Sequence, residues 1–303
     1  MVVLTGIHAT TYRSSSLFQR SFTTVKVVLI LAFCVAAVTL ADPPQPVSLL
    51  PVAGDGALVF SGSFAVSLIY VSYAYTGWNA ATYLTGELAD PQRTLPRVLG
   101  GGTLLVMVLY VALNYAFLKA APMDAMAGRI EVGYVAATHA FGPAGAAIMG
   151  VTLAVLLVST VSAMVMAGPR VLQVIGEDHS LFRRLGRTNR DGIPAVAIVT
   201  QAALSLVFIV TASFETILVF AGFTLGLNSL LTVAGVFVLR VREPDTERPY
   251  RVWGYPFTPL VYIGLTLCTL TYIAMDRPTE ALMAIPLIGS GLVLYLIARR
   301  RRR

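Results

Sequence analysis

Long apolar runs alternate with short polar connectors along nearly the whole chain. Each run has about the 20 residues that a helix needs to cross the hydrocarbon of a bilayer. Prolines and glycines gather at the joints, and no connector is long enough to form a soluble domain. The pattern predicts an all-α protein, a single transmembrane domain over residues 1–303, with eight spans: Phe22–Ala41, Gly56–Leu88, Val98–Leu118, Pro143–Ala167, Ile193–Ala212, Phe214–Leu239, Tyr255–Met275 and Ala281–Ala298.

The stretch from Phe60 to Arg97 contains the one run whose pattern changes in the middle. It is apolar as far as Tyr73, becomes polar and aromatic over Ala74–Asn79 around Gly77, and is apolar again to Leu88. A helix broken inside a membrane exposes backbone groups that lipid cannot satisfy, so such a break lines a cavity or is packed inside protein. Secondary transporters commonly bind substrate at breaks of this kind. The alternative is a simple glycine kink or a helix-packing face.

Composition supports a membrane protein. Of the 303 residues, 56% are hydrophobic and 12% are charged, and the mean hydropathy is +0.76; a soluble domain has about 25% charged residues. The net charge of +7 comes from short blocks of Lys and Arg between apolar runs, which indicates membrane orientation and not nucleic-acid binding.

The positive residues predict the orientation of the spans. With the N-terminus inside, 19 of the 22 Lys and Arg residues fall on one side, and only Lys119, Arg129 and Arg277 fall on the other. This bias places the C-terminus in the cytoplasm. The final arginines, Arg299–Arg303, are then expected to be a cytosolic anchor near anionic lipid.

The first 41 residues allow a second interpretation. Their positive residues, an apolar run over Val27–Val38 and small residues near Ala41 could describe a secretory signal with a long leader. The opening MVVLTGIHAT is too short to span and looks like the tail of an earlier helix whose beginning is not in this chain.

Catalysis and cofactor binding have little support in the sequence. The three histidines, His8, His139 and His179, are scattered without metal-ligand spacing, and no HExxH, GxSxG, Walker or Rossmann pattern is present. Cys34 and Cys268 lie in apolar runs, where they are expected to be buried hydrophobes. We therefore expect no enzyme activity, cofactor or metal.

Few polar side chains lie within the spans. No Asp, Glu or Arg occupies the centre of any span, but Lys26 lies near the cytoplasmic start of the first. Lys26 could snorkel to the headgroups, which its position alone favours, or turn its ammonium into the bundle. Ser159 and Ser162 lie on a run rich in small residues, which is more often a packing face, although their hydroxyls could face a central cavity.

Several segments resemble one known family. YAYTGWNAATYLTGELADPQRTLPR is similar to the sixth transmembrane helix and following loop of amino acid permeases of the amino acid, polyamine and organocation (APC) superfamily. SAMVMAGPRVLQVIGEDHSLFRRLGRTNRDGIP resembles the eighth helix and its cytosolic loop. VREPDTERPYRVWGYPFTP resembles the loop before the eleventh helix, and SSSLFQRSFTTVKVVLILAF the fifth helix.

The resemblance implies an inverted-repeat transporter in which helices one and six are broken and jointly hold the substrate. The family's aromatic gate falls on Tyr73, and the carbonyls that receive the substrate ammonium fall on Tyr73, Ala74 and Thr76. Tyr75 lies among them, and Gly77, Trp78 and Asn79 complete the unwound segment. The fifth-helix lysine that replaces a sodium ion falls on Lys26, and Ser162 corresponds to a small or polar position on helix eight near the same site.

The chain also departs from the family. Members have about twelve spans, whereas the eight predicted here correspond to helices five to twelve, so helix one and half of the binding site are missing. The resemblance implies either a truncated reading frame or a partner chain that supplies the rest. The chain alone is then expected not to transport.

Three hypotheses follow, from different classes of protein. The first is an amino acid permease of the cell membrane, working by alternating access as an antiporter or a proton symporter. The second is a non-transporting fragment or a membrane assembly partner, and the third is a membrane enzyme. The sequence does not identify the amino acid, the coupling mode, the direction of transport or the oligomeric state.

Overall fold

A computed structural model describes residues 2–10, 12–41, 43–59, 61–83, 85–248 and 250–300. All regular structure in these ranges is helical. Of the sequence predictions, Phe60 and the arginines at 301–303 lie outside the described residues. The chain forms two compact units, and each is described by itself. The division into two units does not test the predicted single transmembrane domain, which stays a prediction.

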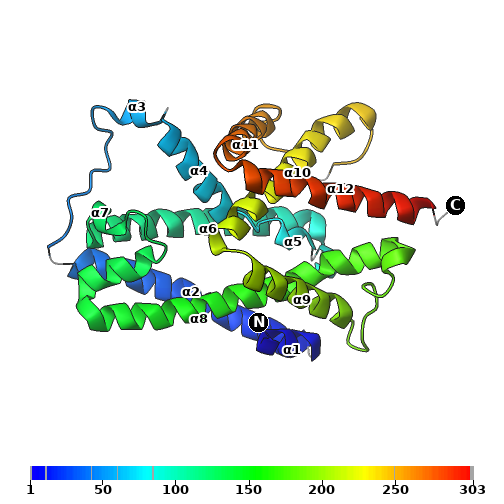
Figure 1. The fold of residues 1–303 in the computed structure, drawn as a ribbon, viewed down its shortest axis with the longest axis horizontal. Helices are drawn as coiled ribbons and strands as arrows, with labels where there is room; N and C mark the ends of the chain where they lie inside the picture. Colours follow the sequence, from blue (N-terminus) through cyan, green and yellow to red (C-terminus); the bar gives the residue numbers. More distant parts are fainter. Residues whose placement is uncertain are drawn as a thin grey trace. The chain divides into compact units, whose positions relative to one another are not determined.

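The first unit comprises Met1–Pro51, Arg97–Val174 and Arg184–Ala202. Its helices, some of which extend beyond these limits, are α1 (Val2–Thr10), α2 (Tyr12–Leu40), α6 (Pro91–Ala120), α7 (Met123–Met126), α8 (Val132–Asp178) and α9 (Ala195–Thr211) (Figure 1).

Close contact between α2, α6 and α8 forms the core of the first unit. Small buried residues lie where these helices meet, among them Ala37, Ala116 and Ala136, each with no exposed surface. Phe33 fills the space beside them, with its ring centroid 5.6 Å from that of Phe117. Small residues let helix backbones approach closely, which is the main packing device available to helices in lipid.

Helix α8 changes direction at Gly142. This residue has φ 68° and ψ −168°, outside the helical region, and Pro143 follows it. A proline is well accommodated in the first turn of a helix, because the amide that it lacks has no partner there. The predicted start of the fourth span at Pro143 therefore corresponds to a real change of direction.

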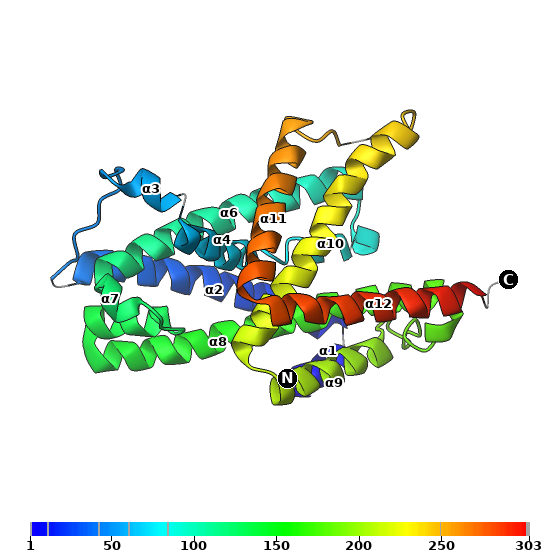
Figure 2. The ribbon, with the colours of Figure 1, turned by 45° about the horizontal axis from the view of Figure 1, so that its top comes forward.

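The second unit comprises Val52–Pro96, Ile175–Arg183 and Ala203–Arg303. It contains α3 (Asp55–Val59), α4 (Gly62–Ala74), α5 (Ala80–Tyr83), the 3₁₀ turns η1 (Thr85–Glu87) and η2 (Ser180–Phe182), α10 (Phe214–Arg242), α11 (Phe257–Asp276) and α12 (Pro278–Arg300). Helices α10, α11 and α12 pack on one another, and α4 packs on α10 and α11 (Figure 2).

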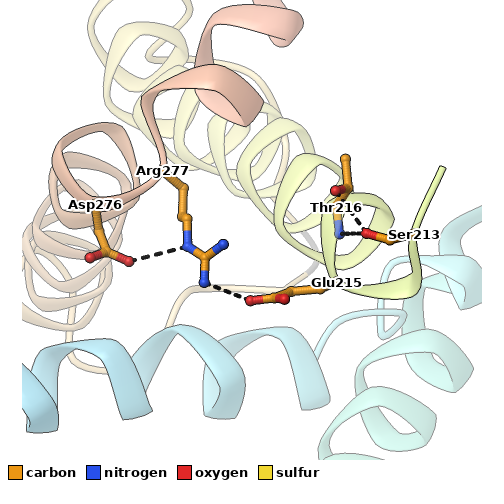
Figure 3. Close-up of polar contacts among 5 residues, drawn as sticks. All are labelled: Ser213, Glu215, Thr216, Asp276 and Arg277. Atoms are coloured by element: carbon orange, nitrogen blue, oxygen red, sulfur yellow. Dashed lines mark hydrogen bonds and ion pairs between the residues drawn. The ribbon is translucent and has the colours of Figure 1, made fainter.

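The start of α10 is fixed by its own side chains. The hydroxyl of Ser213 caps the helix by accepting from the backbone amide of Thr216 at 3.2 Å. Next to the cap, Glu215 forms an ion pair with Arg277, which lies between α11 and α12 (Figure 3). The Glu215 carboxylate is the main cause of a raised pKa for Arg277.

Six helices are long and apolar enough to cross a membrane, judged by length and composition within the described residues: Arg20–Leu40, Pro91–Ala120, Val132–Asp178, Phe214–Arg242, Phe257–Asp276 and Pro278–Ile297. The sequence predicted eight. The predicted span Ile193–Ala212 is the shorter apolar helix α9, and Gly56–Leu88 is divided among several short elements. Pro194 and the capping residue Ser213 limit the length of α9, and the break near Gly77 limits α4.

Candidate functional site

The helix interruption predicted around Gly77 is present. Helix α4 ends at Ala74, a turn occupies residues 75–79, and α5 begins at Ala80. The predicted unwound segment began at Tyr73, but Tyr73 and Ala74 form the last helical residues of α4. The difference arises because the amides of Tyr75 and Thr76 still bond back to Val71 and Tyr73, at 3.2 and 2.9 Å.

The turn closes with a second set of backbone hydrogen bonds. The amide of Ala80 donates to the Gly77 carbonyl at 3.0 Å, and the amide of Thr82 donates to the Asn79 carbonyl at 2.9 Å. Gly77 has φ +98°, a conformation that side chains with a Cβ rarely adopt. A Cβ built on Gly77 would meet no atom within 4 Å. Its backbone conformation, and not a close approach of the main chain, is therefore what requires glycine here.

The Tyr73 carbonyl already accepts two hydrogen bonds. The amide of Thr76 donates to it at 2.9 Å and the hydroxyl of Thr76 at 2.6 Å. A carbonyl oxygen has two lone pairs, so both are used in this conformation. Rotation of the Thr76 hydroxyl would release one of them without disturbing the backbone turn.

The Tyr73 side chain packs against a glycine on α10. A Cβ built on Gly222 would lie 3.3 Å from Cδ2 of the Tyr73 ring. Trp78 is 44% exposed, and Asn79 donates from Nδ2 to the hydroxyl of Tyr83 within the same segment. The Trp78 side chain is thus partly exposed, whereas the Tyr73 ring lies against Gly222 of α10.

Two further predicted residues, Lys26 and Ser162, belong to the first unit. The half-buried Lys26 of α2 donates from Nζ to Oγ1 of Thr160 on α8 at 3.0 Å. Thr160 in turn donates to the Leu156 carbonyl at 3.1 Å, one turn earlier on the same helix. Lys26 thus turns its ammonium toward another helix of its unit.

The environment of Ser162 differs from that of Thr160. Ser162 has no exposed surface, and its Oγ lies 2.8 Å from Nε2 of His8 on α1. One turn before it, Ser159 is also fully buried, and its hydroxyl has no hydrogen-bond partner among the described residues. The face of α8 that carries Ser159 and Ser162 is therefore covered by protein.

The sequence reasoning missed the two residues that contact Ser162 and Lys26. It treated His8 as one of three scattered histidines, and it did not single out Thr160. Nearness in the chain could not have linked them to their partners, which are 154 and 134 residues away. The sequence did contain one indication for Thr160, because this residue lies between Ser159 and Ser162, whose hydroxyls were already candidates.

No candidate metal centre is found in the described part of the chain, where no group of three or more His, Cys, Asp or Glu side chains could hold an ion. The polar groups near the interruption are backbone carbonyls, amides and neutral side chains. Such groups can bind an ammonium or a carboxylate by hydrogen bonds.

Comparison with known proteins gives a consistent family. The sequence model of the family described as "Amino acid permease" matches residues 1–293. The serine/threonine exchanger SteT of Bacillus subtilis is 26% identical over 244 residues, which are 79% of this chain and 56% of that protein.

Two further relatives have similar names. The b(0,+)-type amino acid transporter 1 of Rattus norvegicus is 24% identical over 298 residues, which are 97% of this chain and 60% of that protein. The branched-chain amino acid permease BcaP of Lactococcus lactis is 28% identical over 251 residues, which are 79% of this chain and 52% of that protein. The chain thus spans less than two thirds of the length of these curated relatives.

Proposed function

This chain belongs to the amino acid permease family, and from that premise we propose that it acts in the transmembrane transport of amino acids by alternating access. The substrate is held at the interruption between α4 and α5, around Tyr73–Asn79. Support comes from the positive φ of Gly77 within the turn, and from relatives whose names are those of amino acid exchangers, transporters and permeases.

The proposed role of the interruption is to bind the substrate ammonium. Carbonyls at the end of α4, those of Tyr73, Ala74 and Thr76, are the proposed acceptors. The Tyr73 carbonyl becomes available when the Thr76 hydroxyl turns away, because that hydroxyl is one of its two donors. Tyr73 contributes its ring as the gate over the bound substrate, and Trp78 and Asn79 complete the segment.

The observation that carries most weight for a coupling role is the hydrogen bond from Lys26 to Thr160. A lysine that snorkels to headgroups would extend along its own helix toward water. Lys26 reaches a hydroxyl on α8 instead, so its ammonium can act as a fixed positive charge between two helices. We assign Lys26 the part of a bound cation in the transport cycle.

The proposed setting is the plasma membrane, with the C-terminus in the cytoplasm. The six apolar helices and the family support a multi-pass membrane protein, and the orientation rests on the distribution of Lys and Arg. Ser162 is proposed as a supporting position on α8 and not as a direct ligand, because its hydroxyl is buried against His8.

Uptake measurements test the coupling role. Measured in a form of the protein that transports, Lys26→Ala is expected to lower uptake of labelled amino acids, normalised to surface protein, by at least about tenfold, since a hydrogen bond to a charged group is lost. Thr160→Val should also lower this normalised uptake. Thr138→Val is the matched control, because Thr138 also lies on α8 and bonds back to the carbonyl of Tyr134, at 2.8 Å. Wild-type uptake in the Lys26→Ala protein would contradict the proposal.

A further inference from the structure

Helix α8 carries two hydroxyl groups that lie at nearly the same position along its axis and contact two different helices. Thr160 accepts from Lys26 of α2, and Ser162 bonds to His8 of α1. The two positions are separated by about 200° around the helix and by a rise of about 3 Å. The two partner helices therefore approach α8 from different sides.

The His8–Ser162 pair is sealed inside the first unit. His8 is 4% exposed and Ser162 has no exposed surface. An apolar cluster of Val165, Ile193 and Ile198 lies beside the pair, since Ala9 and Val161, which adjoin His8 and Ser162 in the chain, pack against it. A buried hydrogen bond in such surroundings is costly to break, because no water replaces the lost partner.

We infer that His8 is a positioning residue for the contact between Lys26 and Thr160. This inference rests on the proposed function of Lys26. The hydrogen bond between His8 and Ser162 fixes the rotation of α8 about its own axis, so that the Thr160 hydroxyl points at the Lys26 ammonium.

Apolar packing alone does not fix this rotation well. A helix that is apolar on every side has no strongly preferred face, and α8 carries valine, leucine and alanine all round this segment. The hydrogen bond from Lys26 restrains the rotation of α8 from one side only, and it does so weakly because the lysine side chain is long and flexible. The hydrogen bond between the His8 ring and Ser162 restrains the same rotation from the other side, and the histidine side chain has fewer rotatable bonds.

Ser159 provides a matched control for this inference. Like Ser162 it is fully buried on the same face of α8, but its hydroxyl has no partner among the described residues. Ser159→Ala thus removes the same atom from the same face without removing a hydrogen bond. Ser162→Ala removes the hydroxyl that His8 contacts.

Cross-linking tests the geometry directly and does not depend on transport. Cysteines replace Lys26 and Thr160 in a chain that carries Cys34→Ala and Cys268→Ser, and a short bis-maleimide reagent joins them. We expect His8→Leu and Ser162→Ala to slow this reaction by about fivefold, the change in population that one net hydrogen bond supports. His8→Gln, whose amide keeps a hydrogen-bonding group, should retain most of the reaction, and Ser159→Ala should retain all of it.

Uptake adds an epistasis test in the unmodified background. His8→Leu should lower uptake normalised to surface protein, but it should have little further effect when Lys26 is already alanine. A purely structural role predicts equal fractional losses in both backgrounds and no rescue by His8→Gln. Either result, or unchanged cross-linking in the His8→Leu chain, would overturn the inference. Wild-type uptake by the Lys26→Ala protein would instead overturn the proposed role of Lys26. The cross-linking experiment would still test the role of His8.

Discussion

Glu215 and Arg277 join two helix ends that are 62 residues apart in the sequence. Oε1 of Glu215 lies 2.6 Å from an Nη2 nitrogen of Arg277, and Asp276 lies 3.5 Å from the same side chain (Figure 3). The pKa of Arg277 is raised. Any stabilisation that its positive charge gives the folded protein is therefore fully present at neutral pH, and it is lost only as the pH rises through that pKa. Arg277 is therefore charged across the whole neutral range, where it lies between the start of α10 and the end of α11.

The predicted topology places the two helix ends joined by this contact on one side of the membrane. The rule that favours positive residues in the cytoplasm places the start of α10 and the end of α11 on the same, outer side. Because the ion pair requires these ends to be on one side, a missed or an additional span between residues 215 and 277 would break the agreement.

The first prediction concerns this topology. Single cysteines at Asp55, Glu131 and Glu280 should react with an impermeant thiol reagent added to intact cells, because these positions are predicted to lie outside. Cysteines at Arg93, Arg183 and Arg248 should react only after the membrane is opened. The background carries Cys34→Ala and Cys268→Ser, and reaction of the second group in intact cells would contradict the orientation.

The second prediction concerns the conformation of Gly77. Gly77→Ala should lower the thermal stability of the protein in detergent by about 1 to 3 kcal/mol, because alanine is strained at φ +98°. Gly101→Ala on α6 is the control, since its Cβ also meets open space but its φ is not positive. That change should be neutral or stabilising by up to about 1 kcal/mol. Equal effects of the two substitutions would show that residue 77 tolerates a helical conformation.

The interruption could be predicted from the sequence because its signal is local. Gly77 and its polar neighbours disturb an apolar run, and the predicted unwound segment Tyr73–Asn79 differs from the observed turn, residues 75–79, by two residues at its start. The exact end of α4 depends on the hydrogen bonds of Tyr75 and Thr76. Competition between helical and turn bonds at a helix end is not readable from residue types.

The contacts of α8 could not be predicted in the same way. In a soluble helix the polar face indicates which side meets solvent, but α8 is apolar on most sides. The sequence therefore indicated hydroxyls on this helix without saying that Thr160 would meet Lys26 and that Ser162 would meet His8. Such pairings require the packing of α1 and α2 against α8, which joins distant parts of the chain.

The third prediction concerns the neighbour of the proposed gate. Gly222→Ala places a Cβ 3.3 Å from the Tyr73 ring, which must move by a few tenths of an ångström. We expect the apparent affinity for the transported amino acid to change by about three- to tenfold, corresponding to about 0.7 to 1.4 kcal/mol. Gly235→Ala on the same helix is the control, because its Cβ would meet nothing within 4 Å. Unchanged affinity in Gly222→Ala, with stability preserved, would count against a gating role for the Tyr73 ring.

The fourth prediction concerns the contact between α8 and α9. Gln201 of α9 donates from Nε2 to the Met164 carbonyl at 3.1 Å, and its amide lies directly over Gly168. A Cβ on Gly168 would come within 2.3 Å of Oε1 of Gln201. Gly168→Ala must therefore displace the Gln201 amide, and we expect this shift to break the hydrogen bond to Met164, just before the buried Pro169.

The displaced amide sets the size and sign of the effect. A lost hydrogen bond at a partly buried site costs about 1 to 3 kcal/mol, whereas alanine in place of glycine within a helix gains up to about 1 kcal/mol. We expect Gly168→Ala to lower the melting temperature in detergent and Gly150→Ala, at an open position of the same helix, to leave it unchanged or raise it. Adding Gln201→Ala to Gly168→Ala should recover part of the loss, because the clash disappears. If Gly168→Ala is as stable as Gly150→Ala, then the Gln201 side chain does not hold this position and the close approach of α8 and α9 depends on apolar packing alone.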